Sequence, residues 1–428
     1  MAWSTLNVFQ RLARQWDAAH PYNAAQVLKI SGDPDLSALH ATWHDTLHAL
    51  GLGRVRLDGR SFCYESLNGQ THLYGIRAVP PGVSFEDCIS EELNRRFDNP
   101  AEPPFRPFVL PADGFHYLGV VYHHWVADSV SIRTVLREWF LRLFDPAKAR
   151  RSPLTLPDFG YRRFFDLIHQ ASGLAHGVLT AARWGAGLRQ VRRIQYRCGT
   201  DLSVRFVVRA APPGLIDTLH QAARRHNATL NDLFMAAIAR VSSRYVPLKN
   251  RPHRHGLAVG SIVDLRPYSD TDIADAFGLF LGFTNVFCRA QDFRDPHLLL
   301  RSIARQNTLQ KRGGVPQASA LRMLIGTIVG RLVPPHRMAH FYQKHCPMAA
   351  GISNVNLNRS WAADYHPAPL LDYIRVSPTG PMMPMVFATT TLGRSFHVAL
   401  TDRPSVVPPH RLDALSREFL DALAQYLD

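Results

Sequence analysis

Apolar residues recur along this chain in two spacings, one typical of strands and one typical of helices. Residues 26–30 have the composition of a strand, and two aspartates then precede residues 36–50. One helical face of residues 36–50 contains Leu36, Leu39, Trp43, Leu47 and Leu50. We therefore predict a strand followed by an amphipathic helix that packs on it.

The same pattern returns at residues 115–144. Residues 115–122 form a β-type run, and a short polar turn follows. Residues 130–144 then have helical spacing at Val135, Trp139 and Leu143. This segment predicts a second unit of strand, turn and helix.

Strands and helices also alternate in the second half of the chain. Residues 202–208 predict a strand and residues 212–225 a helix. Thr229 is a suitable helix cap with Asp232 three residues later, and the apolar residues 234–241 predict a core helix. Further strands are predicted at 257–263, 284–287, 373–377, 385–391 and 396–401, and a terminal helix at 412–427.

These elements predict an α/β (α+β) protein without internal repeats. Residues 153–199 are rich in Gly, Ala and Arg, which suits a segment that crosses between two halves. We place the boundary near residue 176, which gives an N-terminal subdomain of residues 1–175 and a C-terminal subdomain of residues 176–428.

The composition fits a folded protein with a large core. The chain has 428 residues, of which 46% are hydrophobic and 19% charged. Its best candidate for a membrane span, residues 321–333, is too short and carries Arg322 and Arg331. The first 16 residues lack the features of a secretory signal. We expect a soluble, cytoplasmic protein without a membrane span.

The cysteines indicate the redox state of the chain, and the charges indicate what kind of partner it binds. Five scattered cysteines without a CxxC spacing indicate reduced thiols, not a disulfide framework or a zinc site of that type. The net charge is +15, and residues 176–428 carry all of the excess, with 31 basic against 16 acidic residues. An acidic partner or ligand is expected on that half.

The turn after the strand at 115–122 carries the strongest candidate chemistry. It contains His123, His124 and Asp128, which are two imidazoles at a strand end and a carboxylate just before a helix. Histidine suits general base catalysis because its ordinary pKa lies near neutral pH, and a nearby carboxylate can orient its ring. Solvated histidines at an ordinary strand end are the alternative, which the position on a strand, turn and helix disfavours.

Other catalytic patterns are weak or missing. His336 and His340 have metal-ligand spacing near His345 and Cys346, but no glutamate follows His336 and prolines surround the segment, so we predict no metal site. The chain has no Gly-x-Ser-x-Gly elbow, no phosphate-binding GxxxxGK[ST] loop and no GxGxxG fingerprint. These absences disfavour serine hydrolases and nucleotide-dependent enzymes.

The three residues of the turn fit the pattern HHxxxD, which resembles the signature of the condensation-domain and CoA-dependent acyltransferase superfamily. Two further segments agree with this resemblance. ATLNDL at residues 228–233 is similar to a helix start early in the second half of these proteins, and FGLFL at residues 277–281 is similar to their "GLFxN" segment. Order, spacing and total length also match, so the resemblance covers nearly the whole chain.

The resemblance implies two chloramphenicol-acetyltransferase-like subdomains that form a pseudo-dimer around a central tunnel. It implies an acyltransferase that moves an acyl group from the phosphopantetheine thioester of a carrier protein or coenzyme A to a small-molecule amine or alcohol. His124 would accept the proton of the acceptor, and no covalent acyl-enzyme would form. Asp128 would be structural and would pair with an arginine of the second half, for which Arg266 is the best match. The product would be an ester or amide of a biosynthetic pathway for natural products.

The chain also departs from the family pattern. Ser129 stands where condensation domains usually have glycine, Gly282 stands where asparagine is expected, and the plant acyltransferase motif DFGWG is missing. These departures favour a stand-alone acyltransferase over assembly-line or plant members. Residues 351–357 resemble the strand that crosses from the second half to cover the tunnel, and Ser129, Ser353 and Asn354 are candidate contacts to the oxyanion or the acceptor. The alternative for the last two is an ordinary strand with polar exposed positions.

Two other functions stay open at this stage. A non-catalytic, condensation-like module would dock an acidic carrier protein without turnover. A nucleic-acid-binding protein would use basic pairs such as Arg192-Arg193 and Arg224-Arg225, but these are dispersed and lack a recognition element, so no nucleic acid is expected.

Overall fold

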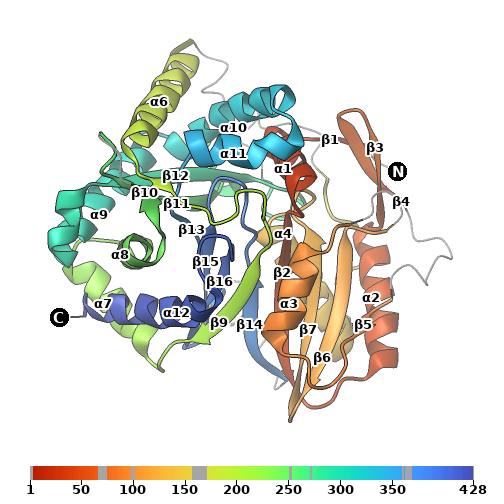
Figure 1. The fold of residues 1–428 in the computed structure, drawn as a ribbon. Coiled ribbons are helices and arrows are strands. Elements are labelled where there is room, and N and C mark those ends of the chain that lie inside the picture. Colours follow the sequence, from red (N-terminus) through yellow and green to blue (C-terminus); the bar gives the residue numbers. More distant parts are fainter. Residues whose placement is uncertain are drawn as a thin grey trace.

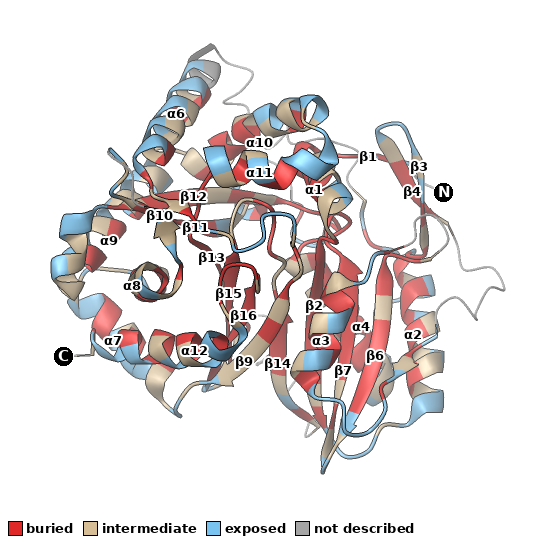
Figure 2. Ribbon diagram, viewed as in Figure 1, coloured by how far each residue is buried: buried red, intermediate tan, exposed pale blue. Residues whose placement is uncertain are grey.

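The computed structural model describes residues 3–65, 75–97, 102–156, 171–249, 253–269, 272–358, 361 and 369–427. Its strands form two main sheets that lie beside each other, with helices on their outer faces (Figure 1). Buried residues concentrate in the strands and on the inward sides of the helices (Figure 2). A cavity lies where the two sheets meet.

The first sheet has five described strands in the order β14-β2-β7-β6-β5. They are β14 (Leu370–Val376), β2 (Asn23–Ser31), β7 (Phe115–His123), β6 (Phe105–Ala112) and β5 (Arg77–Ala78). Its helices are α2 (Leu36–Leu50), α3 (Phe85–Asn94) and α4 (Ser129–Phe144). Helices α2 and α4 pack together on one face of this sheet, and α3 packs between the other face and the second sheet.

The second sheet has six described strands in the order β12-β11-β13-β15-β16-β9. They are β12 (Leu281–Cys288), β11 (Leu257–Asp264), β13 (Ala350–Asn356), β15 (Met385–Leu392), β16 (Ser395–Asp402) and β9 (Arg205–Ala210). The helices that cover its outer face are α7 (Leu215–Arg225), α8 (Leu230–Tyr245), α9 (Pro296–Arg312) and α12 (Pro409–Ala424). The apolar helix α8 is buried in this core, as its sequence predicts.

The remaining helices and short strands lie mostly at one end of the two sheets. The helices are α1 (Val8–Ala19), α6 (Ala171–Gln190), α10 (Val315–Leu332) and α11 (Pro335–His345), with 3-10 turns η2 (Pro146–Lys148), η4 (Arg266–Tyr268) and η5 (Ala290–Arg294). The small strands are β1 (Ser4–Thr5), β3 (Arg54–Asp58), β4 (Ser61–Glu65), β8 (Arg193–Ile194) and β10 (Leu248–Lys249). Helices α1 and α10 pack against each other.

Local signals in the sequence explain several helix boundaries. Asp35 accepts a hydrogen bond from the backbone N–H of Ala38, and α2 begins at the next residue, Leu36. Thr229 and Asp232 form the expected capping box of α8. Side-chain oxygens at such positions satisfy backbone N–H groups that the first helical turn leaves without partners.

The α/β class with two subdomains is confirmed, but one strand was assigned wrongly from the sequence. Residues 351–357 were expected to cross between the halves, whereas β13 pairs on both edges inside the second sheet, with β11 and β15. The strand that crosses is β14, which runs antiparallel to β2 from Leu370 opposite Ile30 to Val376 opposite Ala25.

The predicted boundary between residues 175 and 176 lies within α6. Residues 157–170 of the predicted crossing segment lie outside the described part of the chain. Because β14 comes from the second half by sequence but completes the first sheet, the two halves are joined by a shared element as well as by packing.

Candidate active site

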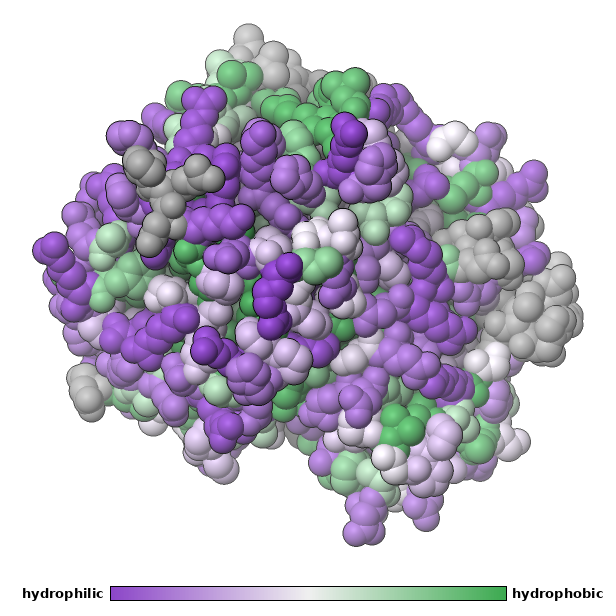
Figure 3. Space-filling view, in the orientation of Figure 1, coloured by the Kyte–Doolittle hydropathy of each residue, from purple (hydrophilic) through white to green (hydrophobic). Residues whose placement is uncertain are grey.

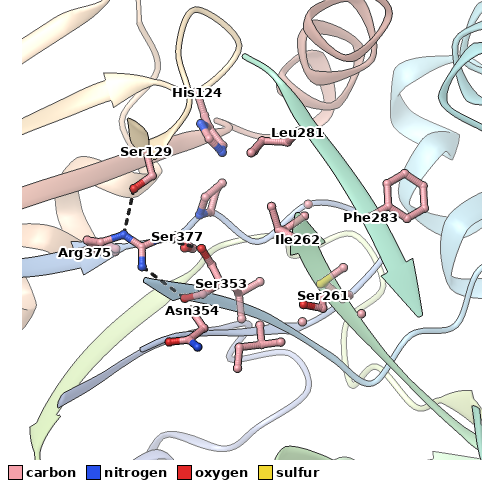
Figure 4. Close-up of a pocket in the computed structure, with 18 of the residues that line it drawn as sticks. His124, Ser129, Ser261, Ile262, Leu281, Phe283, Ser353, Asn354, Arg375 and Ser377 are labelled. Carbon is pink, nitrogen blue, oxygen red and sulfur yellow. Dashed lines mark hydrogen bonds between the residues drawn. The ribbon is translucent and has the colours of Figure 1, made fainter. Parts of the chain in front are cut away.

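A cavity lies between the two sheets, and the HHxxxD turn forms part of its wall. Its lining comes from β2, the turn between β7 and α4, and the strands β11, β12, β13 and β14, with additional side chains from α1. Figure 4 shows His124 and Ser129 projecting toward Ser353, Asn354 and Arg375, which come from strands of the second half. The site is therefore assembled from both halves of the chain.

His124 is buried and lines the cavity, and one of its ring nitrogens has no hydrogen-bond partner among the described residues. Its Nδ1 lies 2.8 Å from the carbonyl oxygen of Ala127. A carbonyl accepts only, so Nδ1 carries the proton and Nε2 is left as an acceptor. Burial lowers the pKa of His124 to about 4, so the ring is neutral at pH 7. A neutral imidazole with a free Nε2 has the form that a general base needs.

His123, the neighbouring residue, has a different environment. Its Nδ1 accepts a hydrogen bond from Trp125 Nε1 at 2.9 Å, and its Nε2 lies 2.9 Å from Asp17 Oδ1. Its ring also stacks on Phe97. Both nitrogens are engaged, so His123 holds the turn in place and does not line the cavity.

Asp128 and Arg266 form a buried, bidentate ion pair. The two carboxylate oxygens lie 2.8 and 3.1 Å from the two terminal guanidinium nitrogens. Asp128 also accepts hydrogen bonds from the backbone N–H groups of Val130, Ser131 and Phe280. Burial alone would raise the pKa of Asp128, but Arg266 and these N–H groups lower it below its ordinary value. Asp128 therefore supports the turn and does not reach the cavity.

The three candidate polar contacts lie together around a residue that the sequence analysis missed. Ser129 Oγ is 2.9 Å from Arg375 Nε, and Ser353 Oγ is 2.6 Å from Arg375 Nη2. Asn354 lines the same wall and accepts a hydrogen bond from Thr389. Arg375 is only 2% exposed. Burial lowers its pKa to about 10, so it remains a cation at neutral pH.

A signal for Arg375 does exist in the sequence. Residues 373–377 were predicted as a strand, in which alternate residues share a face. Arg375 is thus placed on the same face as Tyr373, opposite to Ile374 and Val376, and a charged residue in a short apolar strand is unusual. Both Tyr373 and Arg375 are buried in the structure.

The described residues provide no group of three or more side chains arranged to hold a metal ion. His336 and His340 lie on α11 and are not among the residues that line the cavity. Within the described part of the chain, no helix has both the length and the apolar character needed to span a membrane.

Comparison with known proteins adds evidence that the geometry alone does not provide. The sequence profile of the condensation domain matches residues 10–308. A comparison with curated protein sequences found no match.

Similar folds occur among solved structures, at low sequence identity. Trichothecene 15-O-acetyltransferase TRI3 from Fusarium sporotrichioides has a TM-score of 0.73 at 13% identity, covering 99% of this chain and 95% of that chain. The condensation domain of the monacolin K polyketide synthase MokA has a TM-score of 0.66 at 13% identity, covering 100% and 98%. The X-domain from teicoplanin biosynthesis has a TM-score of 0.60 at 18% identity, covering 99% and 95%. These similarities concern the fold.

Proposed function

The chain belongs to the condensation-domain family, and on that premise we propose that it is an acyltransferase acting on a thioester donor and an amine or alcohol acceptor. The observation that carries this proposal is the neutral imidazole of His124, whose free Nε2 faces a cavity built from both halves. A site that holds two substrates beside a general base supports direct transfer of a group from one substrate to the other.

The reaction follows from the state of this ring. The acceptor hydroxyl or amine donates to Nε2 of His124 while its oxygen or nitrogen attacks the thioester carbonyl. The new C–O or C–N bond forms, and the acceptor proton moves to Nε2. The C–S bond then breaks, and the leaving sulfur takes the proton from the imidazolium, which regenerates neutral His124. No covalent acyl-enzyme is needed.

The donor in this proposal is a phosphopantetheine thioester, presented by an acyl carrier protein or by coenzyme A. The excess of basic residues in the second half supports either donor, because both are acidic. Similar solved structures include domains of a polyketide synthase and of nonribosomal peptide synthetases. A role in natural-product biosynthesis as a stand-alone enzyme is part of the same proposal.

The test uses pooled acyl-CoA and acyl-carrier donors with mixed amines and alcohols, and product detection by mass spectrometry. We expect a product with the wild type, and a rate lower by roughly 10²–10⁴ in a folded His124→Ala variant. His336→Ala, which removes an exposed histidine of α11, is the matched control and should keep full activity. Equal rates in the wild type and His124→Ala would remove His124 from the mechanism. Binding of a carrier without any product would favour the docking-module alternative.

A further inference from the structure

One wall of the cavity consists of hydrogen-bond donors around a buried positive charge. It is formed by Ser129 at the start of α4, Ser353 and Asn354 on β13, and Arg375 on β14 (Figure 4). A general base does not require such a wall, and the protein's own hydrogen bonds use only part of its donors.

Arg375 contacts neutral oxygens within the described part of the chain. Its four hydrogen bonds go to Ser129 Oγ, Ser353 Oγ and the backbone carbonyls of Ser353 and Thr389. A guanidinium has five N–H donors, so these bonds leave one N–H of Nη2 without a partner among the described residues. A buried cation that contacts only neutral groups is costly, and an anion beside it would offset that cost.

The hydrogen bonds to Arg375 also fix the direction of the two hydroxyl groups. Ser129 Oγ accepts from Arg375 and from Gln26 Nε2, so its two lone pairs are occupied and its own hydrogen is available to donate. Ser353 Oγ likewise accepts from Arg375. The side-chain oxygen of Asn354 accepts from Thr389, which leaves its NH₂ group as the donor. Each of the three side chains therefore has a group that can donate to a ligand, and for Ser129 both acceptor sites are already occupied.

The rest of the lining suits an apolar molecule. Leu281, Phe283, Ile262 and Val355 face the same cavity. The one carboxylate among the described lining residues is Asp264, and it is 3.3 Å from Arg266, so it does not neutralise Arg375. The cavity thus combines apolar walls with one positively charged, donor-rich wall.

We propose that Ser129, Ser353, Asn354 and Arg375 bind a carboxylate carried by one of the two substrates, whose remaining part is apolar. A carboxylate accepts hydrogen bonds only, with about four lone-pair sites, and so it matches a wall rich in donors. The assignment of this carboxylate to a substrate rests on the proposed acyl transfer. The binding site itself follows from the geometry and is testable without turnover.

The test compares octanoate with octanamide, which have the same shape but differ in charge. Calorimetric titration of the wild type should show octanoate binding at least about tenfold more tightly than octanamide. In Ser353→Ala and in the Ser129→Ala, Ser353→Ala double variant, we expect this preference to fall to about twofold or less, with octanamide binding unchanged. Ser261→Ala removes a serine from β11 in the same cavity and should keep the full preference.

Arg375→Lys keeps the charge but not the fork of donors, so it should retain part of the preference if it folds. Equal binding of the two probes to the wild type, or a preference that survives the double variant, would overturn the proposal. If the wild type bound the two probes equally and Ser353→Ala slowed turnover, the wall would instead stabilise the transient oxyanion of the reaction, and the proposal would be wrong. A preference for octanoate in a protein that shows no acyl transfer would support the site while rejecting the proposed function.

Discussion

The two adjacent histidines of the turn differ in which ring nitrogen the protein leaves available. His123 has Trp125 at one nitrogen and Asp17 at the other, whereas among the described residues His124 has a partner at Nδ1 alone, the carbonyl of Ala127. The backbone carbonyl thus selects the tautomer of His124 that carries a basic Nε2. The different roles of two identical side chains arise from their hydrogen bonds.

The pH dependence of turnover tests this assignment. Burial lowers the pKa of His124 to about 4, so the base stays unprotonated over the whole neutral and mildly acidic range. We expect kcat/KM to remain flat from pH 8 down to about 5 and to fall with an apparent pKa near 4. An acidic limb near 6.5 would show that His124 titrates as an exposed histidine and would contradict the burial argument.

Stability should begin to fall at a higher pH than the rate, so thermal melting is the control for the rate profile. Between about pH 6.5 and 4 the unfolded chain protonates this histidine while the folded chain does not, so unfolding gains a proton as the pH decreases. His20, whose pKa burial also lowers to about 4, acts in the same direction. The rate must therefore be measured only at pH values where thermal melting shows a folded protein.

The ion pair between Asp128 and Arg266 should matter for stability as much as for rate. Both side chains are buried, so removing one partner leaves an uncompensated charge. We expect Asp128→Ala and Arg266→Ala each to lower the free energy of unfolding by roughly 3 kcal/mol, measured by urea denaturation. The partly exposed pair Arg54–Glu65 is the matched control, and Glu65→Ala should cost about 1 kcal/mol or less. Similar losses for both pairs would contradict the structural role of Asp128.

The sequence predicted features that depend on neighbouring residues, such as helix bounds. It did not predict contacts between residues that are far apart in the chain. The two aspartates before residue 36 and the apolar spacing after them predicted α2 at its observed bounds, and the structure shows that Asp35 is the cap. Arg266 was identified only through the resemblance, because 138 residues separate it from Asp128. Arg375 was missed because its partners Ser129 and Ser353 come from two other elements, which no local pattern brings together.

At the scale of elements, the strand assignment shows the same limit. The sequence identified both β13 and β14 as strands, but the pairing partner of each is set by the tertiary fold. Strand β13 is enclosed by two parallel neighbours, and β14 joins the edge of the other sheet next to β2. The functional consequence is that Ser353 and Arg375, from adjacent parts of the chain, reach one cavity wall from different sheets.

Gly282 provides a test at this scale, since the family pattern favours asparagine there. A Cβ at Gly282 would lie 2.5 Å from the backbone oxygen of Pro316, in the first turn of α10. Helix α10 therefore packs too closely on β12 for any side chain at this position. We expect Gly282→Asn to lower the free energy of unfolding by about 1–3 kcal/mol in urea denaturation.

The matched control for this substitution is Gly185→Ala in α6. Among the described residues, and apart from the backbone of α6 itself, no heavy atom lies within 4 Å of a Cβ placed at Gly185, so the change should be neutral or should stabilise the helix by up to about 1 kcal/mol. If Gly282→Asn were as well tolerated as Gly185→Ala, the close packing of α10 would not be the reason for the missing asparagine.

At the scale of the whole molecule, charge is distributed unevenly along the chain. The first 175 residues are neutral overall, and the remainder carries the net charge of +15. Hydrophilic side chains cover much of the face seen in Figure 3, and apolar side chains gather there over α10, where Leu324, Ile325, Ile328 and Leu332 are exposed. A basic half with one apolar helix face suits docking of an acidic carrier protein more than binding of a neutral donor.

The salt dependence of the reaction tests this last inference. If an acidic carrier protein presents the donor, raising ionic strength from about 0.01 to 0.15 M shortens the range of charge attraction from about 30 to 8 Å. We expect the apparent KM for an acyl-carrier donor to rise severalfold over this range while kcat stays constant, because docking weakens and the cavity chemistry does not change. The matched control is the same acyl group on uncharged pantetheine, whose KM should not respond to salt. A carrier KM that is equally insensitive would place docking outside the basic half and would leave its excess charge without a role in donor selection.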